Sequence, residues 1–172
     1  ACLIKKNKSP HIYVFGDSIA SNYIPSLRTF LKNSNYSDVL YLTSNHLLED
    51  ISNPLLRGSK AFNKLKSEIS KKDIIIYSQL THNIDEEVNV LKEELSSLSE
   101  IVSTKGAKLY LVDNPPNFGS DTYFLSKFTL GGDGPALDLK KVKKLRNSHT
   151  KILKEFQNSN KNIFYLDPLE VL

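Results

Sequence analysis

Short apolar runs alternate with amphipathic stretches along the chain, and this alternation predicts strands that alternate with helices. The run HIYVF at residues 11–15 is typical of a buried strand, and Gly16 ends it. Between residues 19 and 32, apolar side chains recur every three or four positions, which indicates a helix. The expected strands cover residues 11–15, 38–42, 73–77, 108–112 and 162–166, and the expected helices cover residues 19–32, 62–69, 84–102 and 138–157.

This order of elements predicts an α/β fold in which a five-stranded parallel sheet is the middle layer of a three-layer α/β/α sandwich, as in flavodoxin-like proteins. The strands are apolar nearly throughout, so helices must cover both faces of the sheet. No linker or internal repeat divides residues 1–172, which predicts a single domain. Ligands of such sheets bind at the carboxyl ends of the strands. Functional residues are therefore expected in segments 16–18, 43–46, 78–83 and 113–117.

Composition and charge restrict the classes of partner. The chain is 40% hydrophobic and 24% charged, and it has no apolar run of membrane-spanning length. Its net charge of +4 owes much to the run KKVKKLR at residues 140–146. Apolar residues interrupt this run at helical spacing, and no aromatic residues are interleaved to stack on bases. We interpret it as the solvated face of a helix and expect no nucleic-acid partner.

Cysteine usage excludes a CxxC site, because Cys2 is the only cysteine. No other cluster of metal-ligand type is present, so no metal or cofactor is expected. Cys2 is either a chance residue near a terminus or half of a disulfide whose partner lies outside the chain. The first residue is Ala1 and no secretory signal follows it, which suggests a part of a longer polypeptide.

The sequence Gly16-Asp17-Ser18 lies where the first strand ends and the first helix is expected to begin. A serine at that junction has its own amide at a helix N-terminus, where an oxyanion can be stabilised. Serine is also among the best N-capping residues, so an ordinary cap is the alternative. The segment lacks the glycines of a dinucleotide-binding loop, the ending of a P-loop and the GxSxG pattern of α/β-hydrolases.

The stretch HIYVFGDSIA at residues 11–20 resembles the first block of the SGNH/GDSL hydrolase superfamily. The stretches DIIIYS, GAKLYLVDNPP and IFYLDPLEVL are similar to the SGNH domain that is fused to bacterial acyltransferase-3 membrane proteins, which modify cell-surface saccharides. The resemblance implies an SGNH hydrolase fold with Ser18 as the nucleophile. It also implies an N-terminal membrane acyltransferase domain in the same polypeptide, and a location on the extracytoplasmic face of the bacterial membrane, periplasmic or at the cell surface.

The same resemblance implies that Asn83 donates to the oxyanion, although Thr81 stands where the family has glycine. Asp17, Thr81 and His82 are the expected substrate-binding residues. Asn83 has an alternative role, because Glu86 follows it by three residues in the pattern of a helix capping box. The family's second-block glycine has no counterpart in segment 43–46.

The general base of the family is the histidine of an Asp-x-x-His segment after the last strand, and no histidine of this chain fits it. His11 begins a strand, and His46 and His82 lie in expected loops without an aspartate three residues earlier. His149 falls on the apolar stripe of the last helix, where we interpret it as a structural, partly buried residue. Asp167 ends the last strand without a following histidine. The base is therefore expected outside residues 1–172.

Taken together, these patterns predict an SGNH-type serine esterase or O-acyltransferase domain that acts on acyl esters of a cell-surface carbohydrate or on a small ester. Without the Asp-x-x-His segment, residues 1–172 alone are expected to be inactive. A catalytically inactive saccharide-binding or docking domain of the same fold is the alternative, and a receiver-type domain is a distant third. The segment 113–137, rich in Asn, Pro and Gly, is either a saccharide-contacting lid or a connector.

Overall fold

The computed structural model describes residues 10–16, 20, 22–36, 38–43, 60–79, 84–113 and 139–170. Within them, five strands form one sheet in the order β2-β1-β3-β4-β5, and every neighbouring pair is parallel. The expected five-stranded parallel sheet is thus confirmed. The strands are β1 (His11–Gly16), β2 (Asp38–Thr43), β3 (Ile74–Ser78), β4 (Lys108–Val112) and β5 (Ile163–Leu166).

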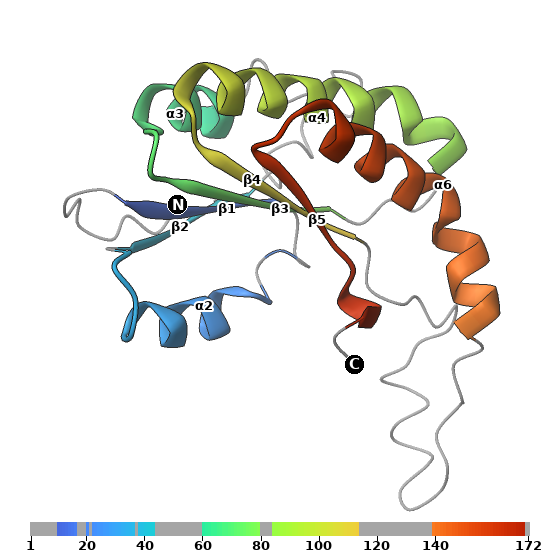
Figure 1. Cartoon of the computed structure of the whole chain (residues 1–172), viewed down its shortest axis with the longest axis horizontal. Helices are drawn as coiled ribbons and strands as arrows, with labels where there is room; N and C mark the ends of the chain where they lie inside the picture. Colours follow the sequence, from blue (N-terminus) through green and yellow to red (C-terminus); the bar gives the residue numbers. More distant parts are fainter. Residues whose placement is uncertain are drawn as a thin grey trace, which may run out of the picture.

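Helices cover the sheet on both faces, as the three-layer prediction requires. In Figure 1, α3, α4 and α6 lie on one face, and α2 lies on the other. A short 3₁₀ helix, η3 (Pro168–Glu170), follows β5. The α-helices are α2 (Ile24–Leu31), α3 (Lys60–Glu68), α4 (Ile84–Lys105) and α6 (Leu139–Ser159).

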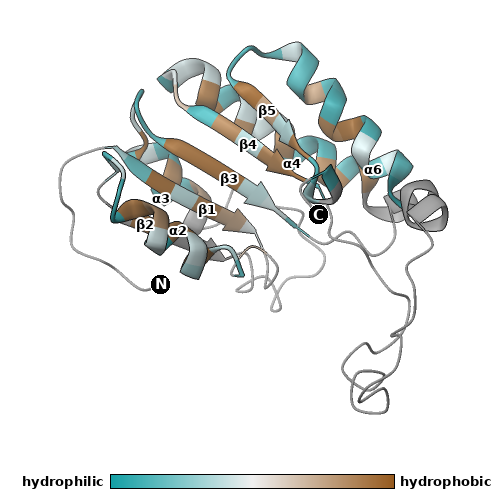
Figure 2. Cartoon of the chain, turned by 60° about the horizontal axis from the view of Figure 1, so that its bottom comes forward, coloured by the Kyte–Doolittle hydropathy of each residue, from teal (hydrophilic) through white to brown (hydrophobic). Residues whose placement is uncertain are grey.

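The strands are apolar because their side chains point alternately into two cores. In β1, Tyr13 and Phe15 join the larger core under α3, α4 and α6, whereas Ile12 and Val14 join a smaller core toward α2. Figure 2 shows the same distribution, with hydrophobic colour concentrated along the central strands. A parallel sheet that is covered on both faces therefore accounts for the nearly continuous apolar runs.

The helix boundaries follow the local residues. α2 begins at Ile24, later than the expected residue 19, and Pro25 lies in its first turn, where a missing N–H costs nothing. α4 ends at Lys105, three residues beyond the expected end: Gly106 follows with a φ of +71°, and its N–H donates to the Val102 carbonyl over 2.8 Å.

At the amino edge of the sheet, a buried carboxylate closes the turn before β3. Asp73, expected as the first residue of the strand, precedes it and is 1% exposed. Its Oδ2 accepts from the Ser70 N–H over 2.7 Å and from Ser70 Oγ over 2.9 Å. Its Oδ1 accepts from the His11 N–H over 2.7 Å. Asp73 thereby joins the starts of β1 and β3.

Candidate active site

The carboxyl edge of the sheet is the side on which parallel α/β proteins bind ligands. There, β1 ends at Gly16 and β3 ends at Ser78, and these two residues are paired in the sheet. Asp113 follows β4, and Asp167 follows β5. The candidate site is built from these four strand ends and the segments that leave them.

Gly16 must be glycine at the end of β1. Its φ is +151°, a conformation that L side chains rarely adopt, and a Cβ at this position would lie 1.8 Å from the Ser78 carbonyl oxygen. The same Cβ would lie 2.9 Å from the Ala20 Cβ. The close approach of β1 to β3 therefore explains the glycine that precedes Asp17 and Ser18.

The side chains that the sequence assigned to catalysis lie outside the described residues, so their predicted roles stay predictions. Because Gly16 pairs with Ser78, the segments that carry Ser18 and Asn83 start from adjacent strand ends. The predicted features outside the described residues are Cys2, Asp17, Ser18, His46, Thr81, His82, Asn83 and the segment 114–138.

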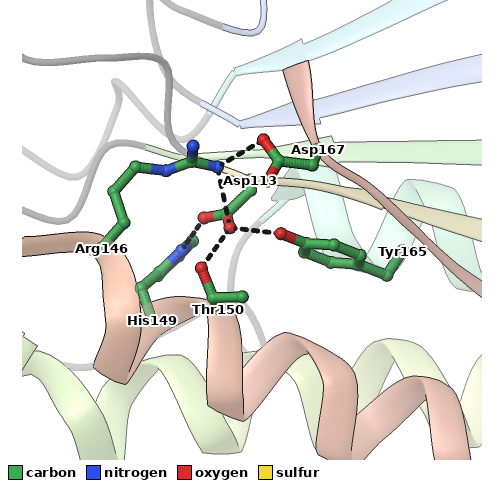
Figure 3. A network of polar contacts seen from close by, with 6 residues as sticks. All are labelled: Asp113, Arg146, His149, Thr150, Tyr165 and Asp167. Carbon is green, nitrogen blue, oxygen red and sulfur yellow. Dashed lines mark hydrogen bonds and ion pairs between the residues drawn. The ribbon is translucent and has the colours of Figure 1, made fainter. Parts of the chain in front are cut away.

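A polar network centred on Asp113 occupies the carboxyl ends of β4 and β5 (Figure 3). Asp113 is 0% exposed, its Oδ1 lies 2.6 Å from His149 Nδ1, and its Oδ2 accepts from Thr150 Oγ1 over 2.5 Å. The same Oδ2 accepts from the Tyr165 hydroxyl over 2.7 Å and lies 2.9 Å from Arg146 Nη2. The carboxylate thus joins β4 to both α6 and β5.

The electrostatics of this network keep Asp113 ionised. Burial alone would raise the pKa of Asp113, but hydrogen bonds from His149, Thr150 and Tyr165 lower it from 3.8 to about 2. An ionised carboxylate can only accept, so His149 Nδ1 must carry a proton and donate. Burial, and then the hydrogen bond to Asp113, raise the pKa of Tyr165 well above its ordinary value. At neutral pH the tyrosine is therefore a donor and the aspartate an acceptor.

Arg146 differs from what the sequence predicted for the basic run 140–146. It is 7% exposed and not part of a solvated face. Its Nη2 contacts Asp113, and the same atom donates to Asp167 Oδ1 over 3.0 Å. The prediction was wrong for this residue because Arg146 points to the sheet, where it forms ion pairs with Asp113 and Asp167.

The histidines in the described part of the chain are both bound to aspartates. His149 is 3% exposed, which confirms a buried residue on the inner face of the helix. His11 lies at the amino edge, where its Nδ1 is 3.7 Å from Asp73 Oδ1. The length of β1, about 17–20 Å for six residues, separates His11 from the carboxyl edge. Among the described residues, the buried atoms Arg146 Nε and His149 Nε2 have no hydrogen-bond partner.

Sequence reasoning missed the Asp113 network, although a signal for it was present. Arg146 lies three residues before His149, and Thr150 lies three residues before the core residue Leu153, so these polar residues share the helical spacing of the apolar face of α6. Polar residues on the apolar face of a helix require buried partners. Asp113 at the end of a buried strand offers one, but the pairing joins residues more than thirty positions apart and is not visible in local pattern.

The described residues contain no group of three or more His, Cys, Asp and Glu side chains that could hold a metal ion. Within the same part of the chain, every helix is too short or too polar to cross a membrane.

Comparison with known proteins places these features in a family. The family model of the SGNH domain (fused to AT3 domains) matches residues 1–172. No curated protein matches the chain. A solved structure from Slackia heliotrinireducens, described as an SGNH hydrolase, superposes with a TM-score of 0.60 at 14% identity, and covers 96% of this chain and 84% of that one. The structure of TesA has a TM-score of 0.40 at 17% identity, and covers 86% of this chain and 99% of that one.

Proposed function

This chain belongs to the family of SGNH domains that are fused to AT3 domains. From that membership we propose that it hydrolyses acyl esters, or transfers their acyl group, through a serine nucleophile. Ser18 attacks the acyl carbonyl, and its alcohol oxygen forms the new ester bond as the substrate's alkoxy group leaves. The observation that carries the proposal is the end of β1. There, Gly16 packs against the Ser78 carbonyl and begins the Gly-Asp-Ser sequence at the ligand-binding edge of the sheet.

The oxyanion of the tetrahedral intermediate is stabilised by the Ser18 N–H and the Asn83 side chain. Support for this pairing comes from the register of the sheet, since Gly16 and Ser78 end adjacent strands and precede the two residues by a few positions. Such donors stabilise the oxyanion more strongly when the protein already holds them in the right positions. Asp17, Thr81 and His82 are the proposed substrate contacts.

The proton of Ser18 passes to a histidine outside residues 1–172 in the natural polypeptide. His11 lies at the opposite edge of the sheet, and His149 is buried with its Nδ1 on Asp113. A serine hydroxyl without a base is a poor nucleophile, so the proposed chemistry requires such a histidine.

The proposed substrate is an acyl ester of a cell-surface carbohydrate, and the proposed partner is a membrane acyltransferase domain in the same polypeptide. The family's fusion to AT3 domains supports both. It also supports a location on the extracytoplasmic face of the bacterial membrane, where such saccharides are exposed. The acyl group is then either hydrolysed to a carboxylic acid or transferred to a saccharide hydroxyl.

The test is ester turnover by the natural polypeptide that contains this chain. With an acetylated saccharide or p-nitrophenyl acetate as substrate, Ser18→Ala should lower kcat/KM by at least about 10³-fold. Labelling by a fluorophosphonate probe should disappear in the same variant. Retained turnover in Ser18→Ala would contradict the assignment, and saccharide binding without any labelling of the wild type would favour the inactive binding domain.

A further inference from the structure

Two carboxylates from neighbouring strands converge on a single nitrogen atom of Arg146. Nη2 lies 2.9 Å from Asp113 Oδ2 and 3.0 Å from Asp167 Oδ1. The two carboxylate oxygens are therefore at most about 6 Å apart, a distance at which like charges repel strongly outside bulk water. Arg146 places one positive charge between the two strand ends.

Because these side chains are largely buried, removing the cation should strongly destabilise the arrangement. The side chain of Asp113 is 0% exposed, that of Arg146 is 8% exposed and that of Asp167 is 18% exposed. Removing one partner from a buried ion pair leaves an uncompensated charge, which is far more costly than losing a surface pair. Without the guanidinium, the two carboxylates would have to move apart or admit water.

The same two strand ends are coupled through the backbone. The Asp113 N–H donates over 3.0 Å to the carbonyl of Leu166, which is the last paired residue of β5. Asp113 directly precedes the segment 114–138, and Asp167 directly precedes η3. Any separation of the two carboxylates would change where both following segments start.

We propose that Arg146 is a positioning residue that clamps the carboxyl ends of β4 and β5 to each other and to α6. Through Asp113 and Asp167 it fixes the starting points of the two segments that leave this edge. Its contribution to ester turnover rests on the function proposed above, whereas the clamp itself can be tested without turnover.

A purely stabilising ion pair is the competing explanation, and three variants separate the two. Arg146→Met removes the cation at similar side-chain length. Arg146→Lys keeps one cationic nitrogen, which can serve both carboxylates because both ion pairs involve the same Nη2 atom. Asp73→Asn is the matched control, since it weakens a buried carboxylate at the opposite edge of the sheet.

Amide hydrogen exchange on the 172-residue chain tests the clamp directly. In Arg146→Met, exchange at residues 111–113 and 164–167 should rise at least about tenfold, with little change at residues 12–14 and 74–76. Arg146→Lys should restore most of the protection, and Asp73→Asn should leave the carboxyl edge as it is. Equal acceleration at both edges in Arg146→Met, or no acceleration at the carboxyl edge, would overturn the proposal.

Turnover by the natural polypeptide tests the catalytic consequence. At a temperature where all variants are folded, Arg146→Met should lower kcat by about 10- to 100-fold with KM little changed, because displaced groups no longer meet the bound ester correctly. Arg146→Lys should recover much of kcat, and Asp73→Asn should match wild type. A loss in Arg146→Met no greater than in Asp73→Asn would refute the positioning role. The function itself is judged separately by Ser18→Ala.

Discussion

Asp73 and Asp113 are buried carboxylates at opposite edges of one sheet, and they are held in different ways. Asp73 accepts from the backbone and hydroxyl of Ser70, three residues away, and from the backbone of His11. Asp113 is bound by side chains of α6 and β5, among them an arginine and a histidine. At the amino edge, Asp73 is thus held chiefly by backbone and hydroxyl donors, with His11 Nδ1 3.7 Å away, whereas at the carboxyl edge Asp113 is held by side chains that include an arginine.

The largest expected effect comes from removing each carboxylate in turn. Asp113→Ala should lower the free energy of unfolding by about 3–5 kcal/mol, because it leaves Arg146 and His149 buried without their common partner. Asp73→Ala should lower it by about 1–3 kcal/mol, because the groups left behind are neutral donors. Urea denaturation measures both. Equal losses would show that the two edges do not differ in the way described.

The glycines of the two edges offer a second comparison. Gly16→Ala should cost about 3 kcal/mol, since its Cβ would collide with the Ser78 backbone and its φ of +151° is strained for alanine. Gly106→Ala should cost about 1 kcal/mol, because its φ is +71° but the nearest atom is Lys71 Cγ, a flexible side-chain atom 3.3 Å away. Thermal unfolding of the two variants should rank them in this order. A milder Gly16→Ala would mean that β1 and β3 can separate at their ends.

Acid should weaken the carboxyl edge through Asp113. Its pKa is lowered from 3.8 to about 2, so the stabilisation is present above about pH 4 and is lost as the pH falls toward 2. The difference corresponds to about 2 kcal/mol of unfolding free energy. Urea denaturation between pH 2 and 5 should therefore show a steeper acid loss in wild type than in Asp113→Asn. Parallel curves for the two proteins would contradict the assigned pKa.

The smallest expected effect concerns a single hydroxyl. Tyr165→Phe removes one donor to Asp113 and should cost about 1 kcal/mol. Tyr110→Phe is a matched control in the adjacent strand, where the ring stacks on Phe164 with centroids 5.0 Å apart, and should cost less. Chemical denaturation can resolve this difference. An equal cost would mean that the Tyr165 hydroxyl adds little to the network.

The strands and layers were predictable because burial on both faces of a parallel sheet leaves a nearly continuous apolar run, as in residues 11–15. Gly16 was likewise predicted as the end of the first strand, although its contact with Ser78 was not predicted. The pairing within the Asp113 network was not predicted: polar residues on the inner face of α6 indicate buried partners, but Arg146 cannot be told from its lysine neighbours until the rotation of α6 against the sheet is known. The positions of the nucleophile and oxyanion residues stay predictions from the Gly-Asp-Ser motif and its family resemblance.

The strand order has a consequence for how this protein acquires its shape during synthesis. β1 is the first strand of the sheet to be translated, yet it lies between β2 and β3. Its pairing with β3 must therefore wait for a segment some sixty residues later. Asp113 also waits for a distant partner, because Tyr165 follows it by 52 residues and belongs to the last strand of the sheet. Until β5 has been translated, the turn at Asp73 can already be complete, whereas the network around Asp113 still lacks the hydroxyl of Tyr165.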